Sequence, residues 1–160
     1  MCCFLYPICR LYCEEIDVGE EAPRQIASGL RENYTEAELM GRKVLVVCNL
    51  KEAKLQGFAS NGMVLACKRT VEQADGTTKV VVQLVEPDAS AVVGERVGLP
   101  GVEGPVWAPN ATKKHKVWEA VSPHLHTNAE CVACYQDQPL VTLTSKVQCS
   151  VVSNCGSPIS

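Results

Sequence analysis

Apolar and polar side chains alternate near the start of the chain. Within residues 11–18, Ile16 and Val18 fall on one side of an extended backbone, whereas Glu15 and Asp17 fall on the other. This two-residue period is typical of a strand with one buried and one solvated face. The pattern therefore predicts a half-buried strand over this segment.

Two later segments are continuously apolar instead. Residues 43–47 (KVLVV) and 63–67 (MVLAC) are rich in valine and leucine and have no alternation. Such runs favour strands that are buried on both faces. Asp75-Gly76 is a strong turn signal, so the apolar segments on either side of it are expected to form a hairpin. These segments are residues 66–71 and 79–85.

One short helix is predicted between the strands. Thr35 followed by Glu38 fits a capping box, in which each side chain satisfies a free backbone N–H at the start of a helix. Gly41 is typical of the residue that follows a helix C-terminus. We therefore expect one or two helical turns over residues 36–40, preceded by a short strand over residues 24–28.

The character of the chain changes after Pro87. Glycine and proline crowd the span between residues 94 and 109, which predicts a loop that wraps the surface. Trp118 lies in a predicted short helix over residues 117–121, and two further strands are expected to close the chain as a hairpin. These strands are residues 140–144 and 146–152. Five short strands with one helical turn among them predict a small all-β barrel, with a β-sandwich as the alternative.

Composition and charge refine this picture. The 160 residues fit one domain, or one compact domain with an appendage. The formal net charge of −3 argues at first against a nucleic-acid partner. However, residues 11–40 hold eight acidic residues against two arginines, a local net charge of −6, whereas residues 41–69 hold six basic residues against Glu52, a net charge of +5. The local field decides where a polyanion binds.

The candidate chemistry lies in residues 48–68 (CNLKEAKLQGFASNGMVLACK). Lys51 and Lys54 supply point charges, and the Ser60-Asn61-Gly62 run supplies small polar groups and accessible backbone N–H groups. Met63 could offer an apolar face to an unstacked base, although methionine is more often a core residue. The same residues would also fit an ordinary solvated loop and turn. We favour a phosphate-binding surface because the segment carries the local positive charge.

Cysteine chemistry and catalysis are both poorly supported. The chain has ten cysteines but no segment resembling a signal peptide, so we expect mostly reduced, buried thiols in a cytoplasmic protein. The apolar start is too short to span a bilayer. Cys131 and Cys134 form one CxxC, a weak match to a zinc site even with His124 and His126 nearby. No catalytic motif is present, so no enzyme activity, metal or cofactor is expected.

Several motifs together carry a family resemblance. They are LYCEEIDVGE, RQIASGL, RKVLVVCNLKEAKLQGFASNGMVLAC, KKHKVWEAVSPHLHTNAECVACY and VSNCG. From about Leu11 to its end the chain resembles the tRNA-binding domain of the endothelial monocyte-activating polypeptide II family, which is appended to tyrosyl- and methionyl-tRNA synthetases. The resemblance implies a five-stranded oligonucleotide-binding (OB) barrel over residues 11–87. It also implies a C-terminal extension over residues 88–160 that imitates a second subunit, so that the domain would be a monomer.

Two departures from the family pattern stand out. The family begins with a strand of the type LDLRVGKI, whereas the atypical segment 1–10 (MCCFLYPICR) stands here in its place. The barrel is therefore expected to be incomplete at its first strand, with an open edge or an imperfect patch. Glu52 replaces a proline that is common in the family motif NLKPAK, which adds a negative charge between the two lysines.

The resemblance and the residues together give a functional prediction. We expect non-catalytic tRNA binding through backbone and shape, which would deliver tRNA to an aminoacyl-tRNA synthetase of the methionyl or tyrosyl type. The predicted tRNA-binding residues are Arg42, Asn49, Lys51, Lys54, Ser60, Asn61, Gly62 and Met63. Secondary phosphate contacts, or simply a solvated face, are expected at Lys113, Lys114 and Lys116. The alternative function is a protein-interaction module of a multi-synthetase complex or a cytokine-like fragment.

Overall fold

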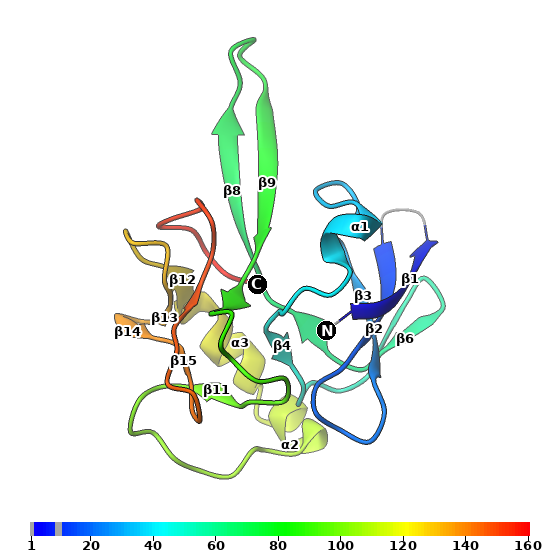
Figure 1. Cartoon of the computed structure of the whole chain (residues 1–160), viewed down its shortest axis with the longest axis vertical. Helices are drawn as coiled ribbons and strands as arrows, with labels where there is room; N and C mark the ends of the chain where they lie inside the picture. Colours follow the sequence, from blue (N-terminus) through cyan, green and yellow to red (C-terminus); the bar gives the residue numbers. More distant parts are fainter. Residues whose placement is uncertain (1, 9–10) are drawn as a thin grey trace.

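A computed structural model describes residues 2–8 and 11–160 and shows a chain made mostly of short strands (Figure 1). Expectations for positions 1, 9 and 10 lie outside the described residues. The first strands and helix are β1 Cys2–Ile8, β2 Leu11–Ile16, β3 Arg24–Ser28, α1 Glu36–Leu39, β4 Val46–Val47, β5 Ala53–Leu55, β6 Phe58–Ser60, β7 Met63–Val64, β8 Ala66–Glu72 and β9 Thr78–Leu84. They are followed by β10 Glu86–Pro87, β11 Val97–Gly98, α2 Pro109–Lys114, α3 Val117–Val121, the 3-10 helix η1 Ser122–His124, β12 Leu125–Thr127, β13 Ala133–Tyr135, β14 Gln138–Pro139, β15 Val141–Thr142 and β16 Cys149–Ser150.

Three antiparallel strands in the order β1-β2-β3 form the sheet at the start of the chain. Glu14 at the centre of β2 is opposite Leu5 on β1 and Ile26 on β3. Of the two expectations for the start of the fold, an open edge or an imperfect patch, the pairing of β1 with β2 agrees with the patch. The pairing is irregular, because its register shifts between Cys2 and Leu5. The strands at 11–18 and 24–28 and the capped helix at 36–40 were predicted correctly, and the Thr35–Glu38 capping box is present.

The centre of the fold joins three chain segments through their backbones. The Leu45 N–H donates to the Val85 carbonyl at 3.1 Å, the Val85 N–H to the Leu65 carbonyl at 3.0 Å, and the Leu65 N–H to the Leu45 carbonyl at 2.9 Å. Because Leu45 bonds to two different segments, the predicted strand over residues 43–47 is regular only at β4, which pairs with β7. Among residues 2–8 and 11–160 the strands form several two- and three-stranded sheets rather than one closed barrel.

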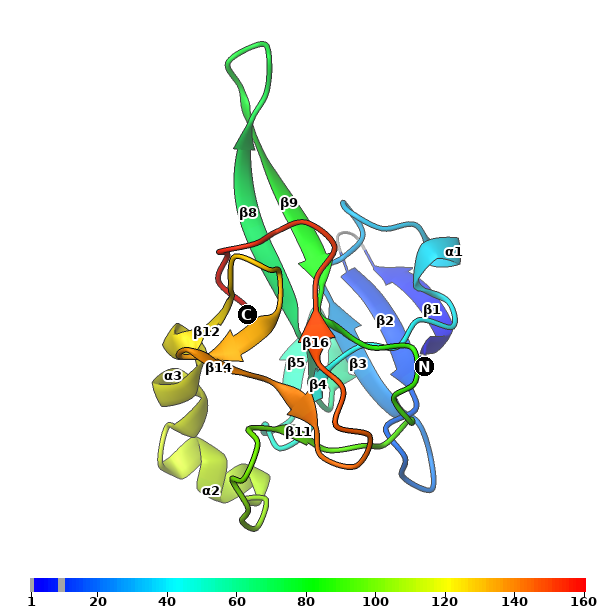
Figure 2. The same ribbon diagram turned by 60° about the vertical axis from the view of Figure 1, so that its left-hand side comes forward.

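Strands β8 and β9 form the predicted hairpin. Seven pairs of residues face each other between Ala66↔Leu84 and Glu72↔Thr78, and Gly76 takes a φ of +77° in the turn. The outer part of this ribbon projects from the body of the molecule, as Figures 1 and 2 both show. Near its base the edge at β8 is paired with the last residues of the chain: the Ala66 N–H donates to the Ser160 carbonyl, the Ser160 N–H to the Ala66 carbonyl, and the Lys68 N–H to the Pro158 carbonyl.

The later part of the chain differs from its prediction in two respects. The closing hairpin is short: its two segments are joined by the bridge between Val141 and Gln148 and by hydrogen bonds from the Thr142 N–H to the Val147 carbonyl and from the Cys149 N–H to the Leu140 carbonyl. Contrary to a simple hairpin, β15 also pairs with β11 and β16 with β10. Helix α2 was missed within the proline-rich span, although proline at the first helical position is a known start signal and Pro109 occupies it. Helix α3 was predicted with its exact bounds.

Two apolar clusters stabilise the fold. The first lies under the sheet of the early strands and contains Tyr12, Ile16, Ile26, Leu30, Leu39, Val64, Ala66, Val82 and Leu84. The second joins early and late parts of the chain and contains Leu45, Leu65, Cys67, Val85, Leu125, Cys131, Ala133, Leu140, Cys149, Val151 and Ile159. Because the second cluster includes Leu45, Leu65 and Val85, residues 88–160 pack directly onto the three-way junction.

The cysteines of the described residues occur both as free thiols and in a disulfide. Cys13, Cys67, Cys134 and Cys149 are buried free thiols, and Cys48 is a half-buried one. The expectation was mostly reduced thiols, and the exception is Cys131, which forms a disulfide with Cys155 with a Cα–Cα distance of 4.2 Å. The partner is therefore not Cys134, the other half of the CxxC motif. In the described part of the chain, no three metal-binding side chains of the His, Cys, Asp or Glu type gather at one point.

Helix length can also be compared with a lipid bilayer. Of the helices in the described ranges, none has the length and apolar character that crossing a membrane requires.

Candidate nucleic-acid interface

The two central lysines of the predicted site lie on a small hairpin and just before it: Lys54 is on β5, and Lys51 is two residues ahead of this strand. Strands β5 and β6 pair through Lys54↔Ala59, and the turn is Gln56-Gly57, whose φ angles are +50° and +88°. Two consecutive positive φ angles are typical of the tight turns that join antiparallel strands. Lys51 and Lys54 are exposed. The sequence indicated a flexible loop here, and a glycine at the second turn position was the available hairpin signal.

The Ser60-Asn61-Gly62 segment is held against β3. Ser60 is only 3% exposed, and its Oγ accepts a hydrogen bond from the Ala27 N–H and donates one to the Gly62 carbonyl, each at 3.0 Å. The Asn61 N–H donates to the Gln25 carbonyl at 2.8 Å. The Ser60 hydroxyl therefore faces the protein and fixes the loop, while Asn61 and Gly62 remain half-buried.

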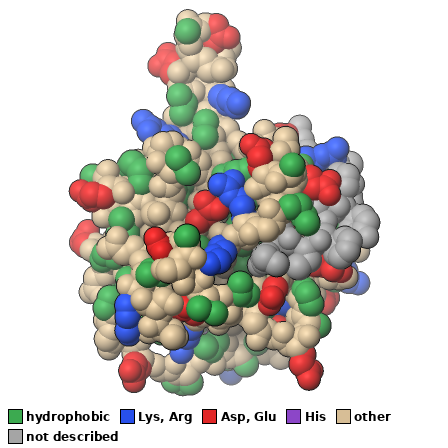
Figure 3. All heavy atoms as spheres, in the orientation of Figure 1, with side chains coloured by type: hydrophobic (Ala, Val, Ile, Leu, Met, Phe, Trp, Pro, Cys, Tyr) green, Lys and Arg blue, Asp and Glu red, His purple; other side chains and the backbone are tan. Residues whose placement is uncertain are grey.

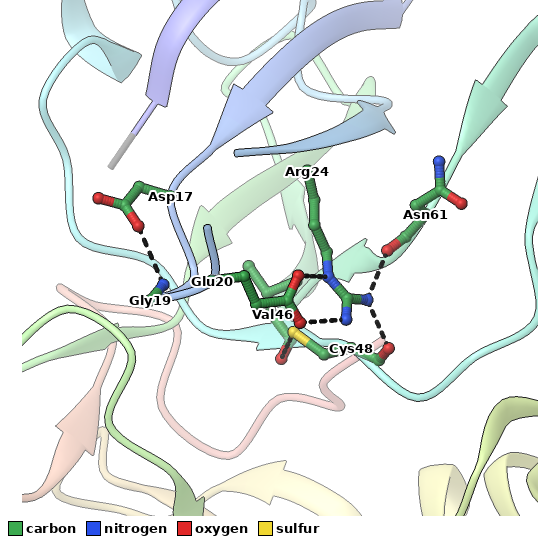
Figure 4. Close-up of polar contacts among 7 residues, drawn as sticks. All are labelled: Asp17, Gly19, Glu20, Arg24, Val46, Cys48 and Asn61. Atoms are coloured by element: carbon green, nitrogen blue, oxygen red, sulfur yellow. Dashed lines mark hydrogen bonds and ion pairs between the residues drawn. The ribbon is translucent and has the colours of Figure 1, made fainter. Parts of the chain in front are cut away.

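Arg24 joins this loop to the Cys48 segment (Figure 4). Its Nη1 donates to the carbonyl oxygens of Cys48 at 2.6 Å and Asn61 at 3.0 Å. Its Nε and Nη2 donate to the Glu20 carboxylate at 2.8 and 2.5 Å. These hydrogen bonds lower the pKa of Glu20 and raise that of Arg24. Sequence analysis missed Arg24, since its importance depends on carbonyl groups that lie 24 and 37 residues further along the chain.

Gly62 and Met63 lie where the loop meets the core. A Cβ on Gly62 would come within 2.9 Å of Ile26 Cδ1 and 3.2 Å of Val46 Cγ1. Such distances are shorter than ordinary van der Waals contacts, so only glycine fits this position without a shift of its neighbours. Met63 is half-buried and packs against the second apolar cluster. The glycine therefore serves close packing of the loop onto β3 and β4.

Asn49 connects the predicted primary and secondary sites. Its Nδ2 donates to the carbonyl of Trp107 and to Oγ1 of Thr112, both at 3.4 Å. Thr112 is buried in α2, and the exposed lysines follow it directly. They are Lys113, Lys114 and Lys116. The fold thus brings the segment around Asn49 next to the helix that carries the secondary lysine cluster.

Arg42 is engaged inside the protein. Its Nε donates to Oε1 of Glu86 at 2.7 Å, its Nη2 donates to Oε2 at 3.3 Å, and its guanidinium lies 5.5 Å from the centre of the Tyr34 ring. The neighbouring Lys43 donates to the carbonyls of Ala89 and Ala91 at 2.5 and 2.7 Å. These two cations of the positive segment therefore bind residues 86–91 rather than extend the field around Lys51 and Lys54.

Charged side chains of both signs are mixed on the face drawn in Figure 3, where blue and red groups alternate. On the hairpin side, exposed Glu52 lies in sequence between Lys51 and Lys54 and reduces their local charge. Phosphate groups can be bound by a few point charges and backbone N–H groups without a large basic patch. The fold and the site together define a small all-β domain with a modest basic surface.

Comparison with known proteins identifies the family. Residues 8–96 match the family described as "Putative tRNA binding domain". This match covers more than half of the chain, which therefore belongs to the tRNA-binding domain family. The finding agrees with the family resemblance carried by the sequence motifs.

Relatives and a solved structure support this membership. The chain is 49% identical over 132 residues to a probable methionine–tRNA ligase of Oryza sativa subsp. japonica, which covers 82% of this chain and 16% of the ligase. It is 39% identical over 129 residues to the aminoacyl tRNA synthase complex-interacting multifunctional protein 1 of Mus musculus. This alignment covers 81% of this chain and 38% of the mouse protein. The chain thus spans between 16% and 38% of the length of these two relatives.

The fold is similar to that of a known crystal structure. The C-terminal domain of Plasmodium vivax p43 matches with a TM-score of 0.79 and 30% sequence identity. The match covers 99% of this chain and 92% of the other. The similarity therefore includes residues 88–160 as well as the part of the chain that the family match covers.

Proposed function

We propose that this domain binds tRNA by its backbone and shape, without catalysis, and brings it to an aminoacyl-tRNA synthetase. The observation that carries the proposal is that Lys54 on the β5–β6 hairpin and Lys51 just before β5 are both exposed, next to the Asn61-Gly62 loop that follows β6. Lysine ammonium groups and loop N–H groups recognise phosphate without regard to base sequence. Linking such a module to a synthetase raises the local tRNA concentration.

The proposed surface has a contacting layer and a supporting layer. Lys51, Lys54, Asn61 and Gly62 contact the RNA, and Met63 lies behind them. Ser60, Asn49 and Arg42 support the surface through their internal hydrogen bonds. Lys113, Lys114 and Lys116 add phosphate contacts from α2 and the residue that precedes α3.

The architecture that supports this function is an opened variant of the OB barrel. In this proposal residues 11–87 form the barrel core, and residues 88–160 form an extension that covers it like a second subunit. The shared apolar cluster of Leu45, Leu65 and Val85 with Leu125 and Leu140 supports this division. Because the extension covers this apolar surface, the domain is proposed to be a monomer. It is also proposed to be cytoplasmic.

A titration of tRNA measures the proposed site directly. Fluorescence anisotropy with a methionine tRNA transcript would be recorded over a range of salt concentrations for the parent and for Lys51→Ala/Lys54→Ala. We expect weaker binding by the variant and a log–log salt slope that is smaller by about 1.5, since each lost phosphate contact reduces the slope by about 0.7–0.9. The matched control is Lys79→Ala/Lys146→Ala, two exposed lysines elsewhere on the chain.

Two outcomes would contradict different parts of the proposal. Equal affinity and equal slope for the parent and the Lys51→Ala/Lys54→Ala variant would mean that the RNA binds elsewhere. If the parent has no measurable tRNA affinity at low salt, tRNA binding itself is wrong.

A protein-interaction module is the second candidate function. The projecting β8–β9 ribbon favours it, because Val71 and Val80 on this ribbon are 40% and 53% exposed. Exposed strand edges can accept a further strand from a partner. Co-purification with a synthetase that survives nuclease treatment, and that is lost in Val71→Lys/Val80→Lys, would support this function. Loss of the complex after nuclease treatment would favour the tRNA-binding function.

A further inference from the structure

An apolar cavity of about 720 Å³ lies between the early strands and residues 88–160. Val44 and Val46 line one side, and Val92, Val106 and Trp107 line the other. The last three side chains are 65%, 61% and 48% exposed, which is unusual for large apolar groups. A well-formed apolar cavity of this size with a few polar groups is typical of a ligand site.

The charged residues at the cavity are already engaged by the protein. Glu20 is bound to Arg24, and Lys43 is bound to two backbone carbonyls. Asp17 accepts a hydrogen bond from the Gly19 N–H at 2.9 Å, and Arg96 donates one to the Gly104 carbonyl at 2.8 Å. Glu95 accepts hydrogen bonds from the Val92 N–H at 2.7 Å and from the N–H and hydroxyl of Ser145. The cavity therefore favours a flat, mainly apolar group rather than an ion.

Among the described residues, Trp107 is the aromatic one that lines the cavity. Its ring packs at 77° against the His115 ring with 5.3 Å between the ring centres. Its backbone carbonyl accepts a hydrogen bond from Asn49, which also lines the cavity. The indole is thus held beside the segment that leads to Lys51.

We propose that this cavity receives an unstacked nucleobase of the bound tRNA, which stacks on Trp107. The inference rests on the proposed function, because the base enters only when the RNA backbone lies on the neighbouring lysines. Lys51 lies two residues after Asn49 in the chain. Lys113 directly follows Thr112, the second hydrogen-bond partner of the Asn49 side chain. The phosphates on either side of the inserted base would therefore meet positive charge.

Base stacking on aromatic residues is tolerant of sequence, since every base has a π-face. The cavity would thus strengthen binding without adding sequence preference. It would also select for RNA with unpaired bases, such as the loops of tRNA, over a continuous duplex.

Tryptophan fluorescence can follow this contact specifically. The chain has two tryptophans, so in a Trp118→Phe background the signal comes from Trp107 alone. We expect a methionine tRNA transcript to quench this fluorescence and a blunt-ended RNA duplex to leave it unchanged. Quenching of equal size by the duplex, or no quenching by bound tRNA, would overturn the inference.

Affinity gives an independent readout. Trp107→Ala should weaken tRNA binding about 5- to 100-fold with an unchanged salt slope, because stacking releases no counterions. Trp107→Phe should recover most of the affinity. The matched control is Val102→Ala, an apolar residue of the same loop that is 58% exposed and does not line the cavity.

The outcomes separate this inference from the proposed function. A parent protein that does not bind tRNA refutes the proposed function. A parent that binds, together with a Trp107→Ala variant of equal affinity, refutes only the base-stacking inference. A weaker Trp107→Ala variant with a changed salt slope also refutes it, because the tryptophan would then act by placing charged groups.

Discussion

Arg24 Nη1 lies 3.0 Å from the carbonyl oxygen of Asn61, although 37 residues separate them in the chain. The same nitrogen also donates to Cys48, so one guanidinium holds two segments of the proposed tRNA surface. The fork geometry of arginine makes this possible, and a lysine would supply a point charge without it. Arg24 thus positions the surface from its β3 side.

Arg24→Lys is expected to weaken tRNA binding while leaving the salt slope unchanged. Hydrogen bonds that involve a charged group contribute about 1.5–3 kcal/mol, so urea unfolding should show a loss of this order. Arg69→Lys on the exposed part of β8 is the matched control. Arg24→Gln, which also removes the charge, should leave the slope unchanged; if it lowered the slope by about 1, Arg24 would itself be a phosphate contact and the positioning role would be wrong.

Glu14 predicts an unusual dependence of stability on pH. It is 1% exposed and accepts one hydrogen bond from Ser28 Oγ at 2.5 Å, and within the described ranges its Oε2 has no hydrogen-bond partner. Burial raises the pKa of this carboxyl from 4.5 to about 7. The folded state therefore holds a proton that the unfolded state releases, and stability falls as pH rises between these two values.

Glu14→Gln should remove this dependence. The amide stays neutral, so we expect the variant to exceed the parent in stability by up to about 3 kcal/mol above pH 7, with little difference near pH 4. Urea unfolding at several pH values measures the effect, with Glu15→Gln on the same strand as the control. Parallel pH profiles for the parent and Glu14→Gln would show that the pKa of Glu14 is the same in the folded and unfolded protein.

Gly19 and Gly94 bring two distant loops into direct backbone contact. Both have positive φ, +80° and +85°, and a Cβ on Gly94 would lie 2.8 Å from Gly19 Cα. Gly94→Ala should therefore destabilise the fold by more than the 1–2 kcal/mol that a positive φ costs by itself, to roughly 3 kcal/mol. Gly101→Ala isolates the backbone cost, since its φ is +75° with open space around it. If urea unfolding showed the same loss of unfolding free energy for Gly94→Ala and Gly101→Ala, the two loops could separate freely to make room for the added Cβ.

The disulfide between Cys131 and Cys155 should stabilise the later part of the chain. It closes a loop with a sequence separation of 24, for which chain entropy predicts about 3 kcal/mol. Cys155→Ser should lower the unfolding free energy by this order, and reduction should have no further effect on that variant. Cys48→Ser, at a half-buried free thiol, is the control. Alkylation of both Cys131 and Cys155 in the denatured, unreduced parent, detected by mass spectrometry, would show that the bond is absent.

Local signals in the sequence were enough to predict several elements of the fold. Asp75-Gly76 fixed the turn of the β8–β9 hairpin, and Thr35 with Glu38 fixed the start of α1. These predictions held because a turn or a cap is stabilised by residues that are neighbours in the chain. The family motifs likewise depend only on residue order, and the tRNA-binding family followed from them.

Partners distant in the chain could not be predicted in this way. Strands β15 and β16 pair with β11 and β10, and Cys131 bonds to Cys155, because packing around the second apolar cluster brings them together. A two-residue strand carries too little periodicity to specify which edge it joins. The sequence therefore predicted a local hairpin for these strands but not their pairing with β11 and β10.

The sequence by itself determined the all-β character, the β8–β9 hairpin, the capped helix and the family. Only the tertiary structure decided which of the predicted site residues face outward. Lys51 and Lys54 remain exposed, whereas Ser60 and Arg42 turn inward to hydrogen-bond partners on other segments. It also added Arg24 and Trp107, whose roles depend on backbone carbonyls and cavity walls contributed by remote parts of the chain. The physical reason is that a residue type sets what a side chain can bind, while the packing of distant segments sets what it meets.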